Sequence, residues 1–175
     1  MTGTTNHHFI AKVAVTMVIA LIGAALVAGP ATAHTYKSAR EERRHIRHRA
    51  KSQIGAPYRS GGTSPSGFDC SGFTRWVFRH HGARLPHNSL DQFRLARTRP
   101  GAKRIWSRDR LRIGDLVFHK TGNGRVGHAG IYIGRGRFIS ATSSGGVRVD
   151  SVWDRYYWGD RWVGATRLRV TQHRF

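Results

Sequence analysis

The stretch Gly67-Phe68-Asp69-Cys70-Ser71-Gly72-Phe73 holds the only cysteine among the 175 residues. Side chains that share one helix face follow from Phe73 at i, i+3, i+4 and i+7, and Gly82 suits the left-handed position after a helix. Asp69 is a residue type that caps helix N-termini. The sequence therefore predicts a helix with Asp69 as its cap and Cys70 in its first turn.

The position predicted for Cys70 favours a reactive thiol. Unpaired backbone N–H groups and the positive end of the helix dipole point at the first helical turn. With a cationic neighbour they lower a thiol pKa from ~8.5 to roughly 3.5–7.5. A single cysteine cannot form an internal disulfide. Burial as an inert thiol and pairing with another chain are the two alternatives.

His128 stands out among the 11 histidines because of its surroundings. A polar, glycine-rich loop over 121–127 precedes it, and strand-like apolar residues follow over 129–133. Two further strand-like segments, 116–118 and 137–142, lie on either side in the sequence. A histidine at a strand edge after a flexible loop can present its ring to a cleft. A surface histidine at a strand start is the plainer alternative.

A cysteine at a helix N-terminus ahead of a sheet that carries a histidine is the arrangement of papain-like cysteine hydrolases. We therefore expect an α+β fold of papain-like type. In it, N-terminal helices, one of them starting at Cys70, pack on a central antiparallel β-sheet. The single cysteine gives no zinc-type spacing with the histidines, so neither a metal nor a cofactor is expected.

With these features together, the sequence resembles the NlpC-type cell-wall cysteine peptidases, a papain-like family. The resemblance runs in one order from about Ala50 to about Leu168. It is carried by six stretches, namely Ala50–Tyr58, Gly61–Thr63, Ser66–Phe73, Gly82–Pro86, Gly114–Phe118 and His128–Gly134. The stretch around Cys70 is the most specific of them.

The resemblance implies an enzyme that hydrolyses peptidoglycan stem peptides, typically between γ-linked D-glutamate and a diamino acid. It implies Cys70 as the nucleophile and His128 as the base. It also implies that Tyr58 lies on the substrate side, and that Asp69 and Ser71 line the pocket for the free amino end of the stem peptide. We expect a secreted or wall-associated thiol protease whose partner is the peptidoglycan stem peptide.

Two positions depart from the family pattern. The third catalytic residue lies twelve positions after the histidine and is usually His, Asn or Gln, but here it is Ser140. A hairpin with the loop Gly134–Gly136 places Ser140 on the face of His128, where its hydroxyl orients the ring directly or through a water. Serine carries no charge, so weaker activity or its loss is the alternative. The second departure is His87, where the family often has arginine.

The N-terminal part of the chain predicts two segments outside the peptidase domain. The uncharged run Val13–Ala28 and the small-x-small pattern Ala31-Thr32-Ala33 are typical of a secretory signal peptide over residues 1–33. An uncleaved anchor is the alternative. Residues 34–49 are expected to be a basic leader or linker, either in contact with wall polymers or disordered. The peptidase domain is expected over 50–175.

Charge indicates a second kind of partner. The chain has 30 Lys and Arg against 9 Asp and Glu, a net charge of +21, which attracts polyanions. For an exported protein we expect anionic wall polymers rather than nucleic acid, and no stable membrane span after signal removal. A catalytically weak or inactive basic module that holds wall polymer on the same scaffold is the competing function. Aromatic residues over 153–158 are expected to pack on the sheet rather than on sugar.

Overall fold

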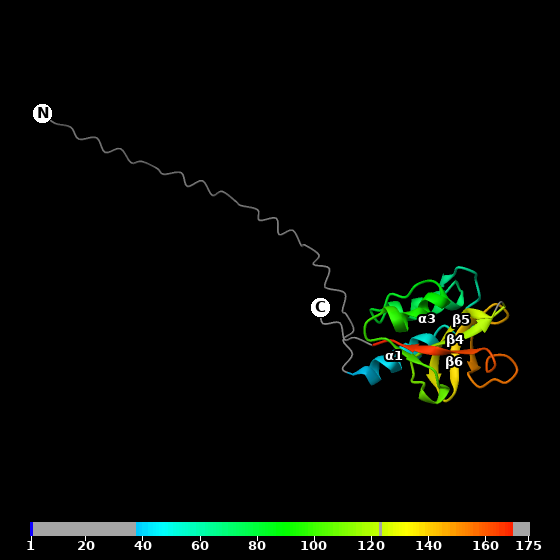
Figure 1. Cartoon of the computed structure of the whole chain (residues 1–175). Coiled ribbons are helices and arrows are strands. Elements are labelled where there is room, and N and C mark those ends of the chain that lie inside the picture. Colours follow the sequence, from blue (N-terminus) through cyan, green and yellow to red (C-terminus); the bar gives the residue numbers. More distant parts are fainter. Residues whose placement is uncertain (2–37, 123, 170–175) are drawn as a thin grey trace. The chain divides into compact units, whose positions relative to one another are not determined.

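The computed structural model describes residues 1, 38–122 and 124–169 (Figure 1). Apart from Met1, the expected signal peptide over 1–33 therefore lies outside the described residues. Among the helices that are described, none is both long enough and apolar enough to cross a bilayer.

A six-stranded sheet forms the centre of the domain, and every pairing in it is antiparallel. The strand order is β3-β8-β4-β5-β6-β7. These strands are β3 (Lys103–Ile105), β4 (Leu116–Thr121), β5 (Arg125–Gly134), β6 (Arg137–Thr142), β7 (Gly146–Ser151) and β8 (Trp162–Arg167). A two-stranded ribbon of β1 (Thr63–Ser64) and β2 (Gly67–Phe68) precedes them.

The helices are α1 (Ala39–Lys51), α2 (Cys70–Arg79), α3 (Ser89–Thr98) and the 3₁₀ helix η1 (Arg108–Arg110). Helix α2 begins at Cys70, as predicted, because the Asp69 carboxylate accepts a hydrogen bond from the Gly72 amide at 2.7 Å. Gly82 follows the helix with a φ of 68°, in the left-handed region. Helices and an antiparallel sheet together confirm the expected α+β fold.

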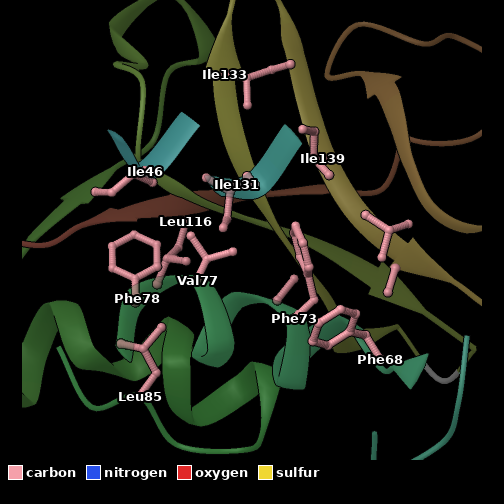
Figure 2. Packing of buried hydrophobic residues seen from close by; sticks show 14 of the residues in the cluster. Ile46, Phe68, Phe73, Val77, Phe78, Leu85, Leu116, Ile131, Ile133 and Ile139 are labelled. Atoms are coloured by element: carbon pink, nitrogen blue, oxygen red, sulfur yellow. The ribbon is translucent and has the colours of Figure 1, made fainter. Parts of the chain in front are cut away.

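The main core lies between the helices and one face of the sheet (Figure 2). Phe73 and Val77 of α2 are fully buried, and they point toward Ile131 of β5 and Ile139 of β6. Residues four apart share one helix face, so both side chains enter the same apolar layer. This packing fixes the N-terminus of α2 against the sheet and thereby determines where Cys70 lies.

Helix α1 is part of this core. Glu42, Ile46 and Ala50 repeat every four residues on one helix face, and all three are buried. Burying an isoleucine side chain contributes about 1.5–3 kcal/mol. Residues 34–37 of the expected leader lie outside the described residues. Residues 39–49 belong to a helix that packs on the sheet, and the packed domain begins before Ala50.

The opposite face of the sheet is also covered. Trp158, from the segment after β7, packs with Val117 and Phe138 in a second apolar cluster. Side chains alternate along a strand, so Val117 enters this cluster while Leu116 and Phe118 enter the main core. Of the aromatic residues expected to pack on the sheet, Trp158 does so, whereas Trp153, Tyr156 and Tyr157 are exposed.

The hairpin between β5 and β6 differs in detail from the predicted one. Arg135 and Gly136 form a two-residue turn with φ values of 55° and 67°, so the loop is one residue shorter than predicted. A register shift within β5 compensates, and Ile131 pairs with Ile139. The position of Ser140 relative to β5 therefore stays as the sequence predicted.

Candidate active site

A cleft of about 570 Å³ opens beside the N-terminus of α2. Tyr58, Cys70 and His128 line it, together with the turn between β6 and β7 and side chains of the segment 154–158. The structure thus brings the expected nucleophile and the expected base to one cavity. Ser140 is fully buried and does not line the cleft.

The Cys70 thiol is half-buried at the first position of α2. Its Sγ lies 3.9 Å from the carbonyl oxygen of Gly127, and no hydrogen bond between Cys70 and the His128 ring occurs among the described residues. Burial raises the pKa of the thiol and the Asp69 carboxylate adds to the rise, while backbone N–H groups, that of Ala129 first, oppose it. The lowered pKa expected from the helix position is therefore wrong, because desolvation outweighs the helix terminus.

His128 lies in β5 with only 6% of its surface exposed. Trp158 stacks on its ring, with the ring centroids 4.5 Å apart and 23° between the planes. Nε2 is buried and has no hydrogen-bond partner among the described residues. Burial lowers the pKa of His128 to about 4. The imidazole is therefore neutral near pH 7 and can accept a proton.

A tight turn holds Trp158 over the histidine. The Asp154 carboxylate accepts hydrogen bonds from the backbone N–H groups of Tyr156, Tyr157 and Trp158, at 3.2, 2.9 and 3.1 Å. These donors, that of Trp158 first, lower the pKa of Asp154. Neither Asp154 nor Trp158 is among the predicted site residues. The sequence feature that could have indicated this turn is an aspartate followed four residues later by an aromatic residue.

His119 and Ser140 lie buried on the same side of the sheet as His128. His119 is the cross-strand partner of His128, and their ring centroids are 6.3 Å apart. Phe138, two residues before Ser140, stacks on His119. The Ser140 Oγ and both His119 ring nitrogens have no hydrogen-bond partner among the described residues, so Ser140 makes no direct bond to His128. Burial lowers the pKa of His119 to about 3, and nearby His128 adds to the effect.

The Asp69 carboxylate is firmly held at the start of α2. One oxygen accepts hydrogen bonds from the Gly72 amide at 2.7 Å and the Ser71 hydroxyl at 2.9 Å. The other lies 2.7 Å from Nε2 of His87. The sequence indicated His87 only as a departure from the family's arginine. His87 lies 18 residues after Asp69 in the sequence, so only the folded structure reveals their contact.

Tyr58 lies at the rim of the cleft, with 38% of its surface exposed. Its backbone forms a parallel bridge with Phe68, two residues before Cys70. Burial raises the pKa of the Tyr58 hydroxyl, and the negative charges of Cys70 and Asp69 add to the rise. The hydroxyl therefore stays protonated and can donate a hydrogen bond into the cleft.

Comparison with known proteins relates this site to one family. A profile of the NlpC/P60 family matches residues 55–167. Murein DD-endopeptidase MepH of Escherichia coli K12 is 38% identical over 120 residues, which are 66% of this chain and 42% of that protein. The probable endopeptidase p60 of Listeria grayi is 40% identical over 119 residues, 68% of this chain and 21% of that protein.

A solved structure shows the same architecture. An NlpC/P60 family protein from Bacillus cereus ATCC 10987 superposes with a TM-score of 0.61 and 30% identity, over 73% of this chain and 40% of that one. The chain thus spans less than half of the length of each of these three relatives.

Proposed function

Because the chain belongs to the NlpC/P60 family, we propose that it is an exported cysteine endopeptidase that cleaves peptidoglycan stem peptides. The names of two relatives, a murein DD-endopeptidase and a probable endopeptidase, support this class of reaction. The observation that carries the proposal is the shared cleft, which both the thiol of Cys70 and the neutral ring of His128 line. The protein would act outside the cell, in contact with the wall.

In the proposed reaction, His128 accepts the proton of the Cys70 thiol and the thiolate attacks the carbonyl carbon of the scissile amide. Backbone N–H groups at the start of α2, including that of Cys70, stabilise the oxyanion. The C–N bond then breaks, and His128 gives its proton to the leaving amine. Water, deprotonated by the same ring, attacks the thioester, which releases the acid and restores the thiol.

The electrostatics favour a neutral thiol and a neutral imidazole before substrate binds. Burial raises the pKa of Cys70 and lowers that of His128 to about 4, so each group resists charge. Proton transfer then accompanies attack on the carbonyl, when the new oxyanion faces the positive end of α2. Ser140 supports the ring through a bridging water, since its hydroxyl and Nε2 of His128 are buried without a hydrogen-bond partner among the described residues.

Substrate recognition is assigned to the side chains around Cys70. The Asp69 carboxylate, next to the nucleophile, attracts the free ammonium group of a stem peptide, and Ser71 holds that carboxylate in place. Tyr58 lines the cleft with a protonated hydroxyl, whereas Asp69 and Ser71 are not among the residues that line it. A free amine bound so near the sulfur suits cleavage a short distance from the amino end, as between γ-linked D-glutamate and a diamino acid.

The variant Cys70→Ala tests the proposal. We expect cleavage of defined muropeptides, followed by mass spectrometry of the products, to fall by at least about a thousandfold because the nucleophile is missing. The exposed Ser66 lies outside the cleft lining, so Ser66→Ala is the matched control and should keep full activity. Unfolding curves of both variants should match that of the wild type. Hydrolysis retained by Cys70→Ala would rule out the cysteine mechanism.

The second candidate function is a non-catalytic basic module that holds wall polymer on the same scaffold. Two observations favour it, namely the raised pKa of the Cys70 thiol and the lack of a direct hydrogen bond between Ser140 and His128. On this alternative, the wild-type protein sediments with insoluble cell wall but releases no soluble peptide from it. Product release that depends on Cys70 would exclude the alternative.

A further inference from the structure

A second concave surface, here called the basic groove, has a volume of about 910 Å³. Helix α1 and the hairpin of β5 and β6 form it. Five cationic side chains line it, namely Arg44, Arg47, Lys51, Arg135 and Arg137. None of the described acidic residues lines the groove, and none of these five cations is in a salt bridge within the described part of the chain.

The secondary structure fixes these five cations on one surface. Arg44, Arg47 and Lys51 follow the spacing i, i+3 and i+7 on α1, so they share one helix face. The buried Ile46 anchors that helix to the core. On the hairpin, Arg135 has a φ of 55°, a left-handed conformation that costs an ordinary residue about 1–2 kcal/mol. The two-residue turn of the hairpin requires this conformation, which holds Arg135 beside the groove.

The basic groove is separate from the candidate active site. His128 lies near the start of β5, whereas Gly134 at the end of that strand lines the groove. Six residues of extended strand span about 20 Å at roughly 3.3 Å each. A ligand in the groove therefore leaves the cleft open to a second molecule.

We propose that the basic groove binds a flexible polyanion built of repeating phosphodiesters without aromatic bases, and that this contact holds the protein on the wall while the cleft stays free. Arginine accounts for four of the five cations, and its planar guanidinium matches phosphate geometry. A concave groove suits a single flexible strand. Without a carboxylate in the lining, the charge is free for an external anion.

Two other polyanions fit the groove less well. Single-stranded nucleic acid is usually held by stacking of bases on large aromatic side chains. No Phe, Tyr or Trp lines the groove, whose rings are the two imidazoles of His45 and His48 on α1. A lipid surface is usually met by exposed apolar side chains that insert among the headgroups. The apolar residues of the groove are Ile113, which is half-buried, and Ile133, which is 5% exposed.

The test measures binding of a fluorescent poly(glycerol phosphate) chain to the 175-residue protein at several salt concentrations. If all five cations contact phosphates, log K falls with log salt at a slope of about −3.5, at about 0.7 per contact. The triple variant Arg44→Gln, Arg47→Gln and Lys51→Gln should bind at least about tenfold more weakly, with a slope near −1.4. Glutamine keeps a helix propensity close to that of the residues it replaces.

The matched control removes the same charge elsewhere. Arg84, Arg97 and Lys103 are exposed and lie outside the groove, so their replacement by glutamine should change the affinity less than about twofold. If the triple variant on α1 unfolds, the double variant Arg135→Gln with Arg137→Gln on the hairpin tests the same groove.

Three outcomes would overturn the proposal. Equal losses in the groove and control variants would mean that net charge alone attracts the polymer. Tighter binding of an oligodeoxythymidine at equal charge would assign the groove to nucleic acid. Tighter binding of phosphatidylglycerol vesicles would assign it to a membrane surface. None of these readouts depends on hydrolysis, so failure of the groove proposal is distinguishable from failure of the proposed peptidase activity.

Discussion

His128 is enclosed by Trp158, which stacks on it at 4.5 Å, and by His119 across the neighbouring strand at 6.3 Å. This enclosure keeps water from the ring, and burial lowers its pKa to about 4. A histidine with an ordinary pKa of ~6.5 would be partly protonated in mildly acidic surroundings and could not serve there as the base that the proposed function requires. The indole cover therefore extends the pH range over which His128 stays neutral.

The variant Trp158→Ala should narrow that range. Exposing the ring to water removes part of the desolvation, so the pKa of His128 rises toward ~6.5. The base must be neutral to accept a proton. On the acid side of the pH profile, kcat/KM of the variant should therefore fall at a pH about 1–2 units higher than in the wild type. The pH profile of muropeptide cleavage and an NMR titration of the His128 ring both measure the shift.

The conservative variant Trp158→Phe serves as the control for this prediction. It keeps an aromatic ring over His128, so the acid limb should stay within about half a unit of that of the wild type. If Trp158→Ala lowered kcat/KM equally at every pH, the indole would serve packing and would not set the charge of the base.

At the scale of the element, the proposed function gives one side chain in the first turn of α2 both a structural and a chemical task. Asp69 caps the helix through the Gly72 amide and pairs with His87. The variant Asp69→Asn keeps a good cap but removes the charge. We expect its unfolding free energy to stay within about 0.5 kcal/mol of the wild type, while KM for stem peptides with a free amine rises about tenfold or more.

Asp69→Ala separates the two tasks. It loses the cap as well as the charge, so it should cost about 1 kcal/mol of stability in denaturant unfolding in addition to the rise in KM. A variant Asp69→Asn with unchanged KM would show that the carboxylate serves the helix alone. Acetylating the amine of the stem peptide should abolish the difference between wild type and Asp69→Asn.

Elements with local signals were predictable from the sequence. Helix α2 has a cap, a periodic apolar face and a terminal glycine within 14 residues, and its start at Cys70 is confirmed. Helix α1 was less visible because Ile46 is its one large aliphatic residue in a charged stretch, and only the sheet beside it explains its burial. The contacts of Asp69 with His87, and of Trp158 with His128, join distant segments and carry no local pattern.

At the scale of the whole molecule, four buried titratable groups within residues 38–122 and 124–169 have shifted pKa values. Burial lowers the pKa of His81 to about 4, of His119 to about 3 and of His128 to about 4. Burial raises the pKa of Glu42 to about 7. Between about pH 4.5 and 6.5 the unfolded chain therefore binds three histidine protons that the folded chain lacks. The folded chain holds one carboxyl proton that the unfolded chain lacks.

The unfolded chain therefore binds about two more protons than the folded chain, so the unfolding free energy should fall as the pH falls. The contribution of the three neutral histidines to the unfolding free energy is complete above about pH 6.5. The unfolding free energy falls as the pH drops toward 4, by at most about 2.7 kcal/mol per pH unit. Denaturant unfolding followed by circular dichroism from pH 4.5 to 7.5, at constant ionic strength, measures this slope. A flat or inverted dependence would contradict the prediction.

The variant His119→Phe isolates one of those protons. His119 is fully buried among Phe138, Trp158 and Trp162, and its ring nitrogens have no partner among the described residues, so a phenyl ring fits the site chemically. At pH 7 we expect the unfolding free energy of the variant to lie no more than about 1 kcal/mol below that of the wild type. Toward pH 5 the slope should be shallower by about 1.4 kcal/mol per pH unit, because one proton is removed from the balance. An unchanged slope would mean that His119 takes up its proton within the folded protein, so the aromatic enclosure around it would not exclude charge.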